Sequence, residues 1–85
     1  MLLYAMGPSQ RFQARRVLVV DDNMDYVHTL ALLLKGMGHQ TEFAISGQTA
    51  LTMARRFRPD VVLLDLALPD MDGAAVCRQL RLEGF

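Results

Sequence analysis

Two apolar runs of this sequence end in acidic side chains. Residues 61–64 are followed by Asp65, and residues 17–20 are followed by Asp21 and Asp22. If both runs are strands of one parallel sheet, the three carboxylates lie together at the edge where α/β sheets bind ligands. Carboxylate oxygens bind divalent metal ions, and an aspartate can act as a nucleophile toward phosphorus. The spacing therefore predicts a site for a metal ion and for phosphoryl transfer.

The elements that must position these acids follow from the hydrophobic pattern. Residues 16–20 are a short valine-rich run, which is typical of a strand buried on both faces. A helical spacing of apolar residues begins at Asp25, with Asn23 available as a cap, and ends at Gly36. Residues 40–45 alternate polar and apolar side chains, as expected of an edge strand with Glu42 on its wetter side.

The second half of the chain repeats this order of strand and helix. A second helix begins at Ser46 and ends before Pro59, with its arginines in water. Residues 60–64 form the third predicted strand and 66–72 the loop after it. A third helix spans 73 to about 83. Within the loop we interpret Asp70 and Asp72 as turn and cap residues rather than metal ligands.

The order βαβαβα predicts an α/β fold with a parallel sheet covered on both faces. In a flavodoxin-like sheet the first and third strands are neighbours, which brings Asp65 beside Asp21 and Asp22. Taken alone, Asp21 and Asp22 could equally cap the first helix, but the presence of Asp65 favours the metal site.

Length, charge and cysteine content restrict the class of protein. The chain has 85 residues, enough for one domain, and its nine basic and nine acidic side chains cancel. No global charge therefore points to nucleic acid or to an anionic membrane, and no apolar stretch approaches the roughly 20 residues of a membrane span. The single cysteine, Cys77, suits a reducing compartment such as the cytoplasm. We expect residues 1–14 to be a flexible N-terminal extension and 15–85 to be the domain.

The two acidic motifs together resemble the receiver domain of two-component response regulators. Residues 17–23, VLVVDDN, match the first strand of the family and its acidic pair. Residues 59–65, PDVVLLD, and 68–73, LPDMDG, match its phosphoacceptor strand and the loop that follows. The resemblance covers about residues 16–84, and it is specific because two motifs occur in the right order and at the right distance.

The resemblance implies a phosphoacceptor signalling module in a two-component phosphorelay. Asp65 would accept a phosphoryl group from a sensor histidine kinase or a phosphotransfer protein. Asp21, Asp22 and Asp65 would serve Mg²⁺, together with the backbone carbonyl of Ala67. Because Mg²⁺ keeps several waters, Asp22 and Asp65 suffice as direct carboxylate ligands while Asp21 acts through water.

The sequence departs from the family after the third helix. Receivers continue through two more βα units, which carry a switch Ser or Thr and a phosphate-pairing Lys, so we expect an incomplete receiver. Two alternatives follow: a binding or homodimer fragment that pairs through an exposed third strand at residues 61–64, and a truncated receiver without function. An enzyme with its own substrate is not expected, since there is no nucleotide-binding glycine loop. Position 67 is also alanine, where phosphatases of the haloacid dehalogenase type carry a second acid.

Overall fold

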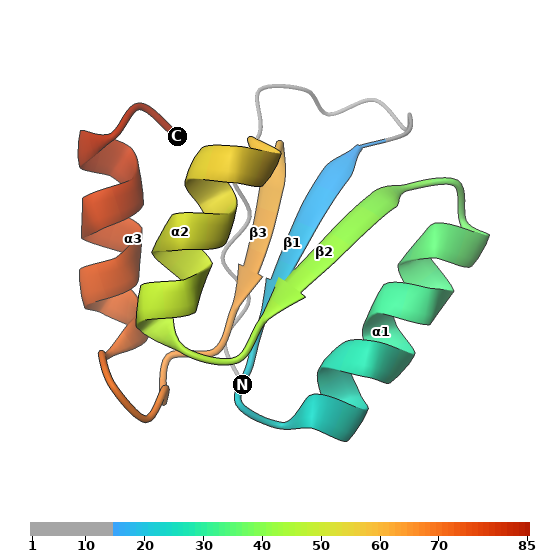
Figure 1. The fold of residues 1–85 in the computed structure, drawn as a ribbon, viewed down its shortest axis with the longest axis horizontal. Coiled ribbons are helices and arrows are strands. Elements are labelled where there is room, and N and C mark those ends of the chain that lie inside the picture. Colours follow the sequence, from blue (N-terminus) through green and yellow to red (C-terminus); the bar gives the residue numbers. More distant parts are fainter. Residues whose placement is uncertain (1–14) are drawn as a thin grey trace.

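A computed structural model describes residues 15–85, which form a three-stranded parallel sheet with helices on both faces (Figure 1). The predicted N-terminal extension, residues 1–14, lies outside the described residues. The strands and helices follow the order β1 (Arg16–Val20), α1 (Met24–Gly36), β2 (Gln40–Ala44), α2 (Gly47–Phe57), β3 (Val61–Leu64) and α3 (Gly73–Leu82). The predicted flavodoxin-like order βαβαβα is confirmed. In the described part of the chain, no helix has the length and apolar character that a membrane crossing requires.

The sheet has the strand order β2-β1-β3, so β1 is central and pairs in parallel with both neighbours. Its valines and leucine are buried, and alternate residues point to opposite faces because side chains alternate along a strand. Leu18 and Val20 belong to the core beneath α2 and α3. Val17 and Val19 belong to the smaller core beneath α1. This arrangement explains why β1 reads as a continuous apolar run.

The helices cover the two faces unequally (Figure 1). On one face, α1 packs Val27 against the sheet. On the other face, α2 and α3 lie side by side and contribute Ala50, Leu51, Val76 and Leu80 to the larger core. The chain therefore changes face between α1 and α2, and β3 returns to the free side of β1. The junction of β1 and β3 is a topological switch point, where sheets of this kind bind ligands.

Strand β2 only partly matches its predicted alternation. Glu42 is exposed, as predicted, and Thr41 and Ala44 are buried, but Phe43 is also 37% exposed. Because β2 is an edge strand, α1 covers only part of its face. The ring of Phe43 stacks instead on His28 of α1, with 6.3 Å between the ring centroids.

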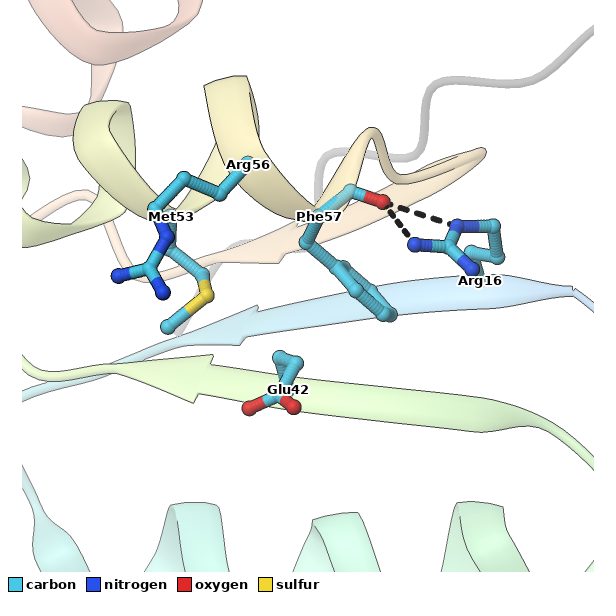
Figure 2. Close-up of a pocket in the computed structure, with 5 residues that line it drawn as sticks. All are labelled: Arg16, Glu42, Met53, Arg56 and Phe57. Atoms are coloured by element: carbon cyan, nitrogen blue, oxygen red, sulfur yellow. Dashed lines mark hydrogen bonds between the residues drawn. The ribbon is translucent and has the colours of Figure 1, made fainter.

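Helix α2 is held at its C-terminus by the first residue of β1. The Arg16 guanidinium donates to the Phe57 carbonyl from Nε at 2.9 Å and also from Nη2 (Figure 2). Its Nε also lies 3.3 Å from the Arg58 carbonyl oxygen, to which it donates. The guanidinium also lies 4.3 Å from the centroid of the Phe57 ring. Arg58 has a left-handed backbone with φ 55°, and Pro59 follows it. The helix therefore ends where the sequence predicts.

Candidate functional site

Two neighbouring strands place the acidic side chains at one edge of the sheet. Val20 and Leu64 are partners in the parallel register, and the Asp65 amide donates to the Val20 carbonyl at 2.9 Å. The residues that follow them, Asp21 and Asp65, are therefore side by side. Carboxylate oxygens of Asp21, Asp22 and Asp65 all lie within 4.8 Å of one another. Among the described residues, these three form the one such group of potential metal ligands.

The three acids differ in exposure and in their backbone contacts. Asp21 is buried, Asp65 is half-buried and Asp22 is exposed. Asp21 Oδ1 accepts a hydrogen bond from the Asn23 amide at 3.0 Å. The cap of α1 is Asn23, whose side chain accepts from the Tyr26 amide at 3.1 Å. Because the helix already has this cap, the acidic pair is left free to face Asp65.

Asp65 is oriented by the loop that follows it. Its Oδ1 accepts a hydrogen bond from the Ala67 amide at 3.0 Å, so the other carboxylate oxygen, Oδ2, can serve as a ligand or nucleophile. Ala67 forms an isolated antiparallel bridge with Asp72, and the Gly73 amide donates to the Leu66 carbonyl at 2.8 Å. The loop is therefore folded back on itself directly beneath α3.

Gly73 permits this close turn because it has no side chain. A Cβ at this position would lie 2.6 Å from Leu66 Cα and 2.8 Å from the Asp65 carbonyl oxygen. Both neighbours are backbone atoms that cannot rotate away. The predicted cap of α3 is present, since the Asp72 carboxylate accepts from the Ala75 amide at 2.9 Å.

Asp70 makes a contact that the sequence did not predict. Its carboxylate accepts from the Gly47 amide at 2.7 Å and from the Gln48 amide at 2.9 Å, at the start of α2. These hydrogen bonds lower the pKa of Asp70, and the one from the Gln48 amide has the larger effect. The next residue, Met71, packs over Gly47, where a Cβ would lie 2.8 Å from its sulfur. The prediction of a local turn residue is thus incomplete, because Asp70 also caps another helix.

The remaining chemically active side chains lie apart from the acidic cluster. His39 Nδ1 accepts a hydrogen bond from the Arg15 amide at 3.0 Å, before the start of β1. The single lysine of the sequence, Lys35, is in the last turn of α1, the end away from Asp22.

A hollow of about 370 Å³ lies between α2 and the sheet and includes Arg16 from the start of β1 (Figure 2). Burial raises the pKa of the Cys77 thiol, so little of it is in the reactive thiolate form.

The donor set of the cluster is chemically specific. It consists of carboxylate oxygens, with no sulfur or imidazole ligand in the group. Hard divalent cations such as Mg²⁺ prefer oxygen ligands and bind through one or two carboxylates while keeping waters. The exposed Asp22 leaves the cluster open to water on one side. The residues present therefore fit a Mg²⁺ ion bound at an open site.

A flavodoxin-like parallel sheet with an acidic cluster at the ends of β1 and β3 has the architecture of the CheY-like receivers. The chemotaxis response regulator CheY4 of Vibrio cholerae superimposes with a TM-score of 0.79 at 30% identity, covering 84% of this chain and 59% of that chain. The BeF3-activated N-terminal receiver domain of Klebsiella pneumoniae RstA has a TM-score of 0.76 at 30% identity, covering 82% of this chain and 60% of that chain.

The sequence comparison identifies the family. The family model of the response regulator receiver domain matches residues 17–84, and the chain belongs to this family. The DNA-binding response regulator MtrA of Mycobacterium tuberculosis is 48% identical over 69 residues, which cover 81% of this chain and 30% of MtrA. The chain spans less than a third of the length of MtrA and of the other curated relatives compared here. Receiver domains of this family are signalling modules of two-component systems.

Proposed function

We propose that residues 15–85 act as a phosphoacceptor module in a two-component phosphorelay, with Asp65 as the acceptor. The observation that supports this most strongly is the meeting of three carboxylates within 4.8 Å at the ends of two adjacent strands. A sensor histidine kinase or a phosphotransfer protein is the donor. The module is not itself an enzyme with a free substrate, because the phosphoryl group ends on its own side chain.

The acceptor chemistry uses the oxygen of Asp65 that the loop leaves free. Oδ2 attacks the phosphorus of the donor phosphohistidine, a P–O bond forms and the P–N bond breaks. The donor imidazole leaves with the electron pair of that bond and takes up a proton from water. The product is an acyl phosphate, a covalent intermediate that carboxylates of this kind can hold.

Mg²⁺ is the cofactor that the donor set fits. Asp22 and Asp65 would hold it directly and Asp21 through water, with the Ala67 carbonyl as the backbone ligand. When bound, the ion supplies positive charge that offsets the negative charge of the acids and of the incoming phosphoryl group. The Asp65 carboxylate is held in a fixed orientation, because its Oδ1 accepts a hydrogen bond from the Ala67 amide at 3.0 Å.

The decisive experiment is phosphorylation of the full chain by a small acyl phosphate, followed by intact mass. With Mg²⁺ we expect the mass of one added phosphoryl group, and with EDTA we expect none. Asp65→Asn should abolish the addition. The matched control is Asp25→Asn, which removes an exposed acid from the first turn of α1 outside the cluster. Labelling that survives in Asp65→Asn, or that is lost equally in Asp25→Asn, would contradict the assignment.

The cellular setting is part of the same proposal. We place the module in the cytoplasm, supported by a single cysteine that cannot form an intrachain disulfide. Balanced charge gives the module itself no attraction for DNA or for an anionic membrane. The printed name of MtrA describes DNA binding by that protein, of which this chain covers 30%. The receiver module would therefore act on nucleic acid only through other parts of a larger protein.

A second candidate function is association of two copies through β3. Within residues 15–85, β3 is an edge strand that pairs with β1 alone, and Val61 and Leu63 are half-buried. An apolar edge of this kind is a template for another strand. Sedimentation without Mg²⁺ should then detect a dimer that Val61→Lys disrupts. A monomer at all concentrations would remove this candidate.

A further inference from the structure

The loop that follows Asp65, residues 66–72, is hydrogen-bonded to the N-terminus of α2, which lies earlier in the sequence. Most hydrogen bonds of the loop are local, such as those from Ala67 to Asp65 and from Gly73 to Leu66. The contacts of Asp70 instead join positions 22 and 23 residues apart, at the start of α2. They anchor the outer part of the loop to an element that is fixed on the sheet.

The carboxylate of Asp70 completes the N-terminus of α2. The first amides of a helix have no partner within the helix. The Ser46 hydroxyl accepts from the Thr49 amide at 3.2 Å. The Asp70 carboxylate accepts from the amides of Gly47 and Gln48, the two residues before Thr49. The first turn of α2 contains no acid of its own. The negative charge favoured at a helix N-terminus is therefore supplied by the loop.

Asp70 is connected to the proposed metal ligand by a short and restrained segment. Two residues separate it from Ala67: Leu68, which is 9% exposed, and Pro69, whose ring fixes φ. On its other side, Met71 packs against the larger core and over Gly47. A shift of Asp70 would therefore be transmitted to the Ala67 peptide rather than absorbed between them.

We infer that Asp70 is a positioning residue, which holds the loop so that the Ala67 carbonyl and Asp65 are placed for the metal ion before it binds. This inference rests on the proposed function and deepens it. Partners that orient a metal ligand from outside typically change metal affinity by about 10- to 100-fold when they are removed. Asp70→Ala should therefore raise the Mg²⁺ dissociation constant of the full chain by about tenfold or more.

The matched control acts on the same helix end without touching the loop. Ser46→Ala removes the other side-chain cap of α2, so it should lower the melting temperature but leave the Mg²⁺ dissociation constant unchanged. Asp70→Asn keeps the shape and one acceptor oxygen, so its Mg²⁺ affinity should lie between those of the wild type and Asp70→Ala. This milder variant also serves if Asp70→Ala unfolds. Titration calorimetry with MgCl₂ measures all four chains.

Amide hydrogen exchange tests the anchoring separately from metal binding. Asp70→Ala should speed exchange at the Ala67 and Gly73 amides, while Ser46→Ala should not. If Ser46→Ala weakens Mg²⁺ binding as much as Asp70→Ala, or if Asp70→Ala changes neither quantity, the inference is overturned. If the wild-type chain binds no Mg²⁺ but the exchange result holds, the proposed function fails, and the anchoring of the loop stands without its role in metal binding.

Discussion

Replacing Gly73 by alanine should destabilise the chain although alanine is the better helix former. Gly73 is the first residue of α3, and a Cβ there would lie 2.6 Å from Leu66 Cα and 2.8 Å from the Asp65 carbonyl oxygen. Overpacking of this kind costs about 1–3 kcal/mol. Because both neighbours are backbone atoms, we place the cost at the upper end, about 3 kcal/mol.

The opposing term is smaller. Alanine in place of glycine gains about 0.5–1 kcal/mol in a helix, so the net loss of stability should be about 2 kcal/mol. A chain of this size has a total stability of about 4–13 kcal/mol. The loss should therefore move the urea midpoint, measured by far-UV circular dichroism, down by about 1–2 M.

The control for Gly73 is another helical glycine with open space around it. Gly36 is the last residue of α1, and a Cβ there would meet nothing within 4 Å. Gly36→Ala should therefore leave the midpoint unchanged or raise it. If Gly73→Ala were as stable as Gly36→Ala, the close approach of Gly73 to the backbone of Asp65 and Leu66 would be wrong. The difference between the two variants is thus the quantity to measure.

Three further predictions concern the packing of α2 and α3. Arg16→Met removes the bonds to the Phe57 carbonyl and should lower the stability, measured in urea, by about 1–2 kcal/mol. The hydrogen bond from Arg55 lowers the pKa of Glu83 to about 2 from a usual 4.5. The ionised Glu83 therefore stabilises the fold above pH 4.5, and this contribution is lost as the pH falls toward 2. In Glu83→Gln, this part of the pH dependence of the melting temperature should be absent. Leu80→Ala empties a fully buried position and should cost about 2–5 kcal/mol by urea denaturation. Leu82→Ala, at a position 82% exposed, should cost much less in the same assay.

The sequence predicts the acidic cluster well because its geometry follows from adjacency. Asp21 and Asp65 each come directly after an apolar strand, and a parallel register places such residues together without any further contact. The caps of α1 and α3 are predictable for the same reason, since Asn23 and Asp72 bond to amides only three residues away.

Two contacts that sequence reasoning missed join distant positions. Asp70 reaches amides 22 and 23 residues earlier, and Arg16 reaches a carbonyl 41 residues later. Whether such pairs meet depends on how helices lie on the sheet, which no local pattern specifies. Similarly, the 37% exposure of Phe43 depends on how much of the edge strand α1 covers. A short polar residue within a loop predicts a cap, but its partner helix cannot be known before the fold.

Helix α2 is held at both ends by charged groups from elsewhere in the chain. The anionic Asp70 bonds to its N-terminal amides, and the cationic Arg16 bonds to its C-terminal carbonyls. Both charges have the sign that the helix dipole favours. Asp70 belongs to the loop that follows Asp65, so the N-terminal cap of α2 is shared between Ser46 of the helix end and a residue of that loop. Removing the Asp70 carboxylate therefore takes contacts from the loop and from the helix together, whereas removing the Ser46 hydroxyl affects the helix end alone.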